Sequence, residues 1–399
     1  MRIPYDNPRV HLYTRIRKSP YFYASRRHGV QSYSVCNRMY HPRHYDDPIA
    51  EYWKLVNDVT LWDVGVERQV EITGPDAFEL TNRLTPRDLT RCQVGQCKFV
   101  LNTDADGGII NNPVLLRLEE DRFWLSVADG DVLLWAKGVA TALDADVCIA
   151  EPDVAPVQIQ GPRSKDLMVD LFGDQVLDIR YYWLERFKLD GMDLVVSRTG
   201  YSGEVGYEIY LYNASRDAMT LWDTILAAGR AHKLAVIGPC QIRRVEAGIL
   251  SYGSDIALDN NRLNDYGFLN PYETGLEWTV DLDQEADFVG KQALTRVAAE
   301  GVTRKVVGVE IDGDPLIGYI EDYLWVYDGE ISSGDSVPIG QVSSVFWSPR
   351  LRKNIGYALV PVSHAEPGTE LVVQSDRGMT AATVVPKPFI DPTKETPKA

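Results

Sequence analysis

Short alternating strands interleave with short helical stretches up to about residue 300. Residues 69–72 alternate polar and apolar side chains before a Gly-Pro turn, which predicts a strand followed by a helix. Residues 104–108 (DADGG) carry two glycines that favour the positive φ of a hairpin turn. Further strands are expected at 123–128 and 157–160, and helices at 131–143 and 162–171. This interleaving predicts an α+β fold rather than a doubly wound sheet.

The pattern changes near residue 300. Beyond it the chain reads as short strands separated by Gly, Pro and Asp turns, which is typical of a small all-β barrel. The expected strands are 306–311, 324–327, 340–345, 355–360, 370–373 and 382–385. We therefore divide the chain into an N-terminal arm (1–48), an α+β body of two intertwined subdomains (49–300), a C-terminal barrel (301–390) and a tail (391–399) expected to fray.

The charge of the chain is unevenly spread. The formal net charge is −16, which argues against nucleic acid as a partner. Residues 1–45 nevertheless carry +8, together with seven tyrosines and four of the six histidines. This arm either wraps the acidic body or contributes to a site for an anionic ligand. No apolar stretch is long enough to span a bilayer, and the first ten residues lack a signal-peptide pattern, so we expect no membrane partner and a cytoplasmic location.

The familiar signatures of several chemistries are missing. Five cysteines are scattered without a CxxC pair, and the histidines are not spaced as ligands, so we expect neither a disulfide framework nor a metal site. The chain has no G-x-G-x-x-G after a strand, no P-loop, no H-E-x-x-H and no G-x-S-x-G. The sequence therefore gives no motif that would indicate dinucleotide binding, nucleotide hydrolysis or zinc-protease chemistry.

One segment remains as a candidate site. Residues 198–208 (RTGYSGEVGYE) place three glycines within seven residues, which form a loop that approaches a flat ligand closely. Tyr201, Glu204, Tyr207 and Glu208 add aromatic faces and carboxylates. A pterin ring needs this combination, because its aminopyrimidine edge presents paired N–H groups to an acceptor. An irregular hairpin with exposed carboxylates would show the same spacing.

This segment resembles the RTGYTGEDGFE motif of the glycine-cleavage T-protein, or aminomethyltransferase, family. Further segments resemble that family in order: 61–64 with 70–74, 107–110, 159–162, 244–248, 270–278, 287–291, and 344–349 with 355–356. The resemblance implies an enzyme with a three-domain folate-binding body that ends in a β-barrel, and tetrahydrofolate as the cofactor. It implies that Glu208 binds the pterin edge and that Tyr201 lines the folate pocket. Tyr252 and Trp278 are further candidates for its walls, with core packing as the alternative.

Two departures separate the chain from the aminomethyltransferases. Asn111 and Asn112 stand where those enzymes carry an acidic pair, and an asparagine cannot exchange a proton. Cys240 replaces an arginine. The related dimethylsulfoniopropionate demethylases share the loss of the arginine and an Asn at the first acidic position, and their N-terminal arm resembles residues 15–37 here. They differ by a tryptophan at the position of Tyr201 and by lacking the segment around 260–269.

The resulting hypothesis is a tetrahydrofolate-dependent demethylase. It would move a methyl group from a small onium or methoxy substrate to N5 of the folate, with Asn111, Asn112 and Tyr201 as the catalytic residues. A cationic substrate favours aromatic walls. The expected substrate-binding residues are Tyr33, Met39, Trp62 and, for a carboxylate, Arg68 or an arginine of the arm. An aminomethyltransferase and a non-catalytic folate-binding protein are the alternatives; the oligomeric state stays open, with a homodimer among the options.

Overall fold

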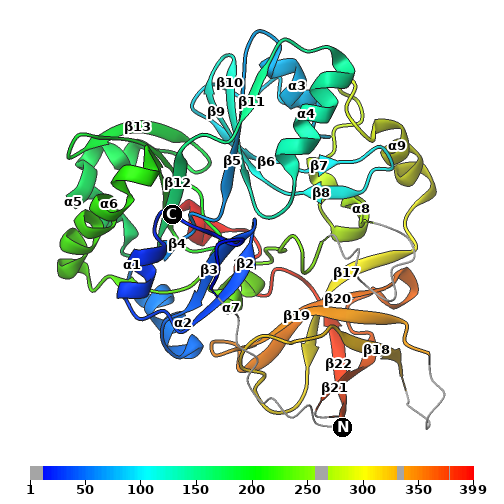
Figure 1. Ribbon diagram of the computed structural model, residues 1–399. Helices are drawn as coiled ribbons and strands as arrows, with labels where there is room; N and C mark the ends of the chain where they lie inside the picture. The colour runs from blue at the N-terminus through cyan, green and yellow to red at the C-terminus, as the bar shows by residue number, and fades with distance from the viewer. Residues whose placement is uncertain (1–11, 257–267, 330–336, 377) are drawn as a thin grey trace.

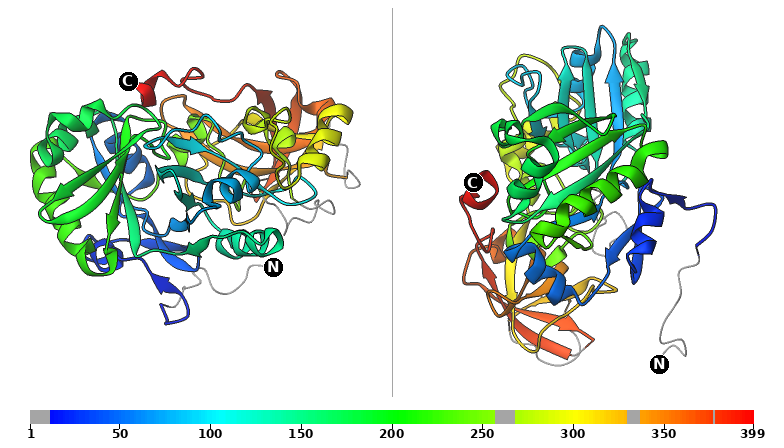
Figure 2. Two further views of the ribbon diagram at one scale, coloured as in Figure 1. Left: turned by 90° about the horizontal axis from the view of Figure 1, so that it is seen from above. Right: turned by 90° about the vertical axis from the view of Figure 1, so that its left-hand side faces the viewer.

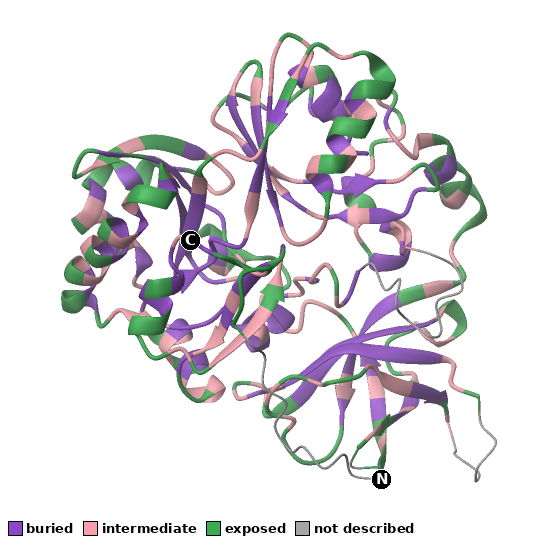
Figure 3. Ribbon diagram, viewed as in Figure 1, coloured by how far each residue is buried: buried purple, intermediate pink, exposed green. Residues whose placement is uncertain are grey.

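The computed structural model describes residues 12–256, 268–329, 337–376 and 378–399. Two lobes of strands and helices lie beside a six-stranded barrel (Figure 1). Buried residues concentrate in the strands, whereas the outer faces of the helices are exposed (Figure 3). The predicted α+β class is confirmed. No helix among the described residues combines the length and the apolar character needed to cross a bilayer.

The first lobe is a six-stranded sheet covered by two helices. Its strand order is β13-β14-β15-β12-β4-β16, and Trp222 of α6 lies fully buried in its core. The antiparallel register of β12 and β15 pairs Gln158 with Glu208, which sets these two polar side chains next to each other on one face. The elements are β4 (Thr60–Asp63), β12 (Val154–Gln160), β13 (Leu184–Leu189), β14 (Met192–Ser197), β15 (Gly206–Tyr212), β16 (Ala235–Val236), α5 (Ser164–Phe172) and α6 (Ala214–Gly229).

The second lobe is a five-stranded sheet of order β11-β5-β10-β9-β6, packed against α3 and α4. A two-stranded hairpin, β7 with β8, extends from it around the predicted 104–108 turn. Asp104 stabilises that turn, because its Oδ1 accepts from the backbone N–H groups of Asp106 and Gly108. The elements are β5 (Arg68–Thr73), β6 (Cys97–Phe99), β7 (Asn102–Thr103), β8 (Ile109–Asn111), β9 (Val114–Glu119), β10 (Arg122–Val127), β11 (Cys148–Ala150), α3 (Ala77–Arg83) and α4 (Val132–Leu143).

Short helices join the lobes to the barrel. The side chain of Asp47 caps α2 by accepting from the N–H groups of Ile49 (3.0 Å) and Ala50 (2.9 Å). Asn270 and Glu273 form a capping box at the start of α8. Helix α7 packs against β19 of the barrel. The bounds of these helices are α2 (Pro48–Asn57), α7 (Gln241–Glu246), α8 (Pro271–Thr274) and α9 (Lys291–Glu300).

The third part is a closed barrel of order β17-β20-β19-β18-β21-β22. Valine-rich strands fill its interior, as alternation predicts for a small barrel. All six strands expected from the sequence are present. Their bounds are β17 (Arg304–Ile311), β18 (Leu324–Asp328), β19 (Gly340–Ser348), β20 (Lys353–Pro361), β21 (Glu370–Ser375) and β22 (Gly378–Val385).

The basic arm folds onto the body, as the first interpretation of its charge predicts, and its contribution to a site for an anionic ligand stays a prediction. Its elements are β1 (Arg17–Lys18), α1 (Phe22–Arg27), β2 (Ser32–Cys36) and β3 (Met39–His44). Three of its arginines form ion pairs with acids of the two lobes: Arg17 with Glu151, Arg27 with Asp223, and Arg38 with Asp131. The β2–β3 hairpin also lines the large cavity described below.

The expectation of a frayed tail at 391–399 is wrong. The tail returns from the barrel to the first lobe (Figure 2) and contains the short helix α10 (Glu395–Lys398). The buried guanidinium of Arg198 holds it there, donating from Nη2 to the carbonyl oxygens of Pro397 and Ala399, both at 3.0 Å. Backbone oxygens from a distant segment therefore accept from the Nη2 of this arginine of the 198–208 loop.

Candidate active site

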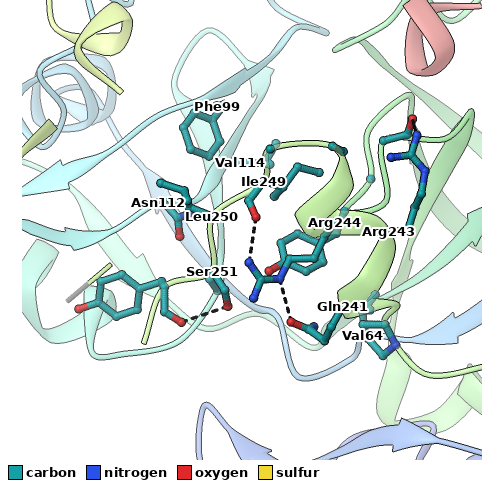
Figure 4. A pocket seen from close by; sticks show the side chains of 18 of the residues that line it. Val64, Phe99, Asn112, Val114, Gln241, Arg243, Arg244, Ile249, Leu250 and Ser251 are labelled. Atoms are coloured by element: carbon teal, nitrogen blue, oxygen red, sulfur yellow. Dashed lines mark hydrogen bonds between the residues drawn. The ribbon is translucent and has the colours of Figure 1, made fainter. Parts of the chain in front are cut away.

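A cavity of about 1170 Å³ lies where the two lobes, the hairpin of the arm and the barrel meet. Its walls come from β2 and β3, from β6 and the segment after β8, from β15 and its preceding loop, and from α7 and the tail. Figure 4 shows Asn112, Phe99 and Val114 on one side of this space and the α7 arginines on another. No single lobe could enclose this volume, so the fold as a whole makes the site.

Glu208 lies at the centre of a hydrogen-bond network in the cavity wall. Its side chain is buried, and Oε2 accepts from Thr199 Oγ1 (2.5 Å) and Tyr210 OH (2.7 Å). Oε1 accepts from Gln158 Nε2 (2.6 Å). This contact points the amide oxygen of Gln158 away from the carboxylate, and that oxygen is buried without a partner among the described residues. The wall thus presents one acceptor without a donor, the Gln158 amide oxygen, beside the Glu208 carboxylate.

A second carboxylate, Glu67, lies close enough to interact with Glu208. Burial raises the pKa of Glu67 well above its usual value, and the nearby charge of Glu208 raises it further. Burial also raises the pKa of Glu208, while its three hydrogen-bond donors act in the opposite direction. Both residues line the cavity. A ligand that brings N–H donors to this wall would favour the ionised form of Glu208.

The glycines before Glu208 are required by protein contacts. A Cβ on Gly200 or on Gly206 would lie 2.3 Å from Gln160 Nε2. Gly203 adopts φ +70°, and a Cβ there would lie 2.5 Å from the Cβ of Ala247. The loop therefore closes around Gln160, whose Oε1 accepts from Ser202 Oγ (2.6 Å). Side chains of the protein therefore approach this loop closely, and the same glycines line the cavity, so the close approach of a ligand stays a prediction.

Of three residues of the 198–208 loop expected to contact folate, two line the cavity and one does not. Tyr201 lines the cavity, and burial raises the pKa of its phenol. Glu204 also lines it, but its carboxylate accepts from Arg243 Nε at 2.6 Å and is thereby neutralised. Tyr207 is buried behind the wall, with the Arg198 guanidinium 5.2 Å from its ring centroid, and does not line the cavity. Packing of Arg198 explains the position of Tyr207.

Tyr252 and Trp278 both line the cavity. The ring of Trp278 stacks on Phe99, with centroids 5.8 Å apart, and the Arg87 guanidinium lies 5.3 Å from the Trp278 centroid. The residue is 55% exposed. Trp278 therefore borders the mouth of the cavity and is not core packing.

The two asparagines occupy different environments. Asn112 lines the cavity, and its Oδ1 has no hydrogen-bond partner among the described residues. Asn111 is fully buried in β8, and its Nδ2 donates to the backbone carbonyl of Asp129. A reacting group in the cavity would consequently meet Asn112. Cys240, at the departure from the family arginine, is buried in the core at the start of α7 and does not line the cavity.

The predicted substrate residues divide into two pairs. Tyr33 and Trp62 line the cavity, and Trp62 Nε1 donates to Thr60 Oγ1 at 2.8 Å. Met39 is buried at the start of β3 and does not line the cavity. Arg68 lies outside the cavity, where it forms an ion pair with Glu151 at 2.7 Å. The expectation that Met39 and Arg68 contact substrate is corrected accordingly.

Several cavity residues were not expected from the sequence. Gln158 could have been found, because a polar side chain stands inside the apolar strand β12. Arg43 is one of the arm arginines that the sequence offered as alternatives to Arg68, without singling it out. The others gave no local signal, because distant segments bring them together: Glu67, His41, Tyr319, Arg243 and Arg244. Among the described residues, no group of three or more His, Cys, Asp or Glu side chains could hold a metal ion.

Comparison with known proteins identifies the class to which this fold and cavity belong. Residues 22–284 match the GCVT N-terminal domain, and residues 304–391 match the glycine cleavage T-protein C-terminal barrel domain. The first match alone covers more than half of the chain. The chain belongs to the glycine cleavage T-protein family, as its motifs predicted.

Individual members of the family differ in how similar they are to this chain. The chain is 38% identical over 370 residues to the dimethylsulfoniopropionate demethylase DmdA of Ruegeria pomeroyi, covering 93% of this chain and 96% of the relative. It is 31% identical to an aminomethyltransferase of Alkaliphilus metalliredigens, covering 87% and 90%. The aminomethyltransferase T structure from Bartonella henselae shares the fold, with a TM-score of 0.81 at 22% identity over 94% of this chain and 99% of that one. The chain is therefore an enzyme of this family.

Proposed function

We propose that this enzyme is a tetrahydrofolate-dependent demethylase acting on a small methylated onium compound similar to dimethylsulfoniopropionate. The observation that carries the proposal is that one cavity is lined both by Glu208, a buried acceptor, and by Asn112, an amide at a position where the resembled aminomethyltransferases carry an acid. The similarity to the demethylase of R. pomeroyi supports the same assignment.

The cavity residues fit a reduced pterin. The aminopyrimidine edge carries adjacent N–H donors, and the wall offers the Glu208 carboxylate and the unpartnered oxygen of Gln158. Tyr201 and Tyr252 provide flat apolar surfaces, and Trp278 borders the mouth. Tetrahydrofolate, when bound, would supply N5 as the methyl acceptor: the bond from the methyl carbon to the onium atom would break as the bond to N5 forms, and the N5 proton would pass to solvent as the products leave.

The remaining chemistry suits a substrate that carries its own leaving group. When the methyl group of a sulfonium or ammonium compound is transferred, the leaving group is a neutral sulfide or amine. The protein therefore needs no general acid to protonate it. The chain's residues orient the substrate and exclude water. Tyr33 and Trp62 contribute aromatic walls that favour a cation, and Asn112 provides hydrogen bonds without a charge.

A turnover assay tests the proposal. The purified enzyme is incubated without oxygen with tetrahydrofolate and one donor at a time: dimethylsulfoniopropionate, glycine betaine, or a methoxyaromatic acid. Chromatography then measures 5-methyl-tetrahydrofolate, which we expect with the sulfonium donor. A parallel reaction with an aminomethylated lipoyl carrier tests the aminomethyltransferase alternative, which the 31% identical relative favours. Product only from the carrier, or folate binding with no turnover, would overturn the demethylase assignment.

A further inference from the structure

The hairpin of the arm brings a second polar cluster to the cavity, away from Glu208. His41 and Arg43 are separated by one residue on β3 and both line the cavity. Tyr319, from the segment between β17 and β18, reaches the same place. The cluster is thus assembled from the arm and the barrel, the first and last parts of the fold.

Contacts with Tyr319 hold Arg43 in position. The guanidinium carbon lies 4.6 Å from the Tyr319 ring centroid, and Arg43 Nη2 donates to the Tyr319 hydroxyl. Phe346 supports Tyr319 from the other side in an edge-on contact with centroids 5.6 Å apart. The cation is therefore fixed at the cavity wall and not free to swing into solvent.

Among the described residues, Arg43 has no carboxylate within ion-pair distance. This distinguishes it from the three other arm arginines that pair with acids of the body, and from two arginines of α7 that share the cavity. Those two are neutralised by internal acids: Arg243 by Glu204 and Arg244 by Asp255, both at 2.6 Å. Arg43 is a cavity cation that leaves its charge available to a ligand.

The histidine beside it adds a donor. Arg43 Nη1 lies 3.4 Å from His41 Nδ1, and a guanidinium only donates, so Nδ1 must accept and the ring hydrogen lies on Nε2. Burial, reinforced by Arg43, lowers the pKa of His41 well below its usual value, consistent with a neutral ring. The buried Nε2 has no hydrogen-bond partner among the described residues. A cation and an unpartnered N–H thus lie together.

We propose that Arg43 and His41 bind the carboxylate of a zwitterionic methyl donor, with Arg43 as the residue that selects for it. A carboxylate supplies the negative charge that Arg43 lacks and an acceptor for His41 Nε2–H. The aromatic walls at Tyr33 and Trp62 lie in the same cavity and suit the onium end of such a molecule. This inference rests on the proposed function and adds the requirement for an acidic group at the far end of the donor.

The test compares two donors in three variants. Dimethylsulfoniopropionate carries a carboxylate and trimethylsulfonium does not. For Arg43→Gln we expect the KM of dimethylsulfoniopropionate to rise about 10- to 100-fold with kcat within about threefold, and the KM of trimethylsulfonium to change less than about twofold. Arg43→Lys should recover part of the loss. Arg38→Gln is the matched control, because Arg38 belongs to the same hairpin but is exposed and does not line the cavity.

Equal effects on both donors, or none on either, would overturn the carboxylate assignment. A binding measurement separates this outcome from failure of the proposed function. Calorimetry with 3-(methylthio)propionate, which keeps the carboxylate but has no onium methyl group, requires no turnover. Wild type should bind it and Arg43→Gln should bind it at least about tenfold more weakly. Equal binding by the two proteins refutes the inference, whereas a lack of turnover with both donors refutes only the demethylase.

Discussion

Replacing Glu208 by glutamine tests the pterin-binding wall directly. The change keeps the size of the side chain but leaves one acceptor oxygen where the carboxylate has two. In the free protein, Gln158 Nε2 donates to one carboxylate oxygen, while Thr199 and Tyr210 donate to the other. The NH2 group of the new glutamine replaces one of these oxygens and must therefore face another donor. We therefore expect a stability loss of about 1–3 kcal/mol.

The effect on folate affinity follows from the same count of acceptors. Loss of one hydrogen bond to a charged group costs about 1.5–3 kcal/mol, which is a 10- to 150-fold weaker Kd. Because N–H donors of a ligand favour ionised Glu208, wild-type affinity should also rise with pH through the raised pKa of this residue. Glu208→Gln should lose that dependence.

Isothermal calorimetry with tetrahydrofolate, run at several pH values, measures both quantities. Denaturant unfolding of the same samples separates binding from folding. Glu185→Gln is a suitable control, because Glu185 is exposed on β13 and should alter neither result. A change in Kd below about threefold, in a variant that unfolds cooperatively, would refute the role assigned to Glu208.

Three further outcomes follow from the structure. Asn112→Ala should lower kcat/KM about 5- to 10-fold with little loss of stability, whereas Asn111→Ala should mainly destabilise the fold by about 1–3 kcal/mol; steady-state kinetics and urea unfolding distinguish them. Arg244→Met should cost about 3–5 kcal/mol in urea unfolding, because it strands the buried Asp255 charge, and Arg244→Met with Asp255→Leu should recover much of this. Burial raises the pKa of Asp63 from 3.8 to about 6, so its contribution to stability is present below pH 3.8 and is lost as the pH rises through 6. Relative to Asp63→Asn, wild type should lose about 3 kcal/mol between pH 4 and 7 in unfolding experiments, and parallel curves would contradict this.

The elements of the fold were largely predictable because they depend on local patterns. The short apolar segments separated by Gly, Pro and Asp turns predicted all six barrel strands, and the two-glycine turn at 104–108 predicted the β7–β8 hairpin. The tail was misjudged for the opposite reason. Its order depends on Arg198, a residue almost two hundred positions earlier, and no local pattern of polar residues reveals that contact.

The candidate site was only partly predictable. The motif around Glu208 stands out from its own neighbouring residues, whereas the resemblance to the family singled out Asn111 and Asn112 together, and only the structure shows that Asn112 lines the cavity. The residues that line the substrate-binding part of the cavity could not be predicted in this way. Their identity depends on which face of a strand points inward and on which acids neutralise which arginines. The sequence left Arg68 and the arginines of the arm as alternatives, since only the structure shows the Glu151 pair of Arg68. The inserted segment around 260–269 falls mainly on residues 257–267, outside the described part of the chain.

The order in which the cavity walls leave the ribosome has a consequence for biogenesis. The hairpin that begins at Ser32 is synthesised long before Pro397, which borders the same cavity. Lobes of a growing polypeptide can fold as they appear. The ligand chamber is not complete before Pro397 has been synthesised, so reduced folate should stabilise a nascent chain truncated before that residue less than a chain that contains it.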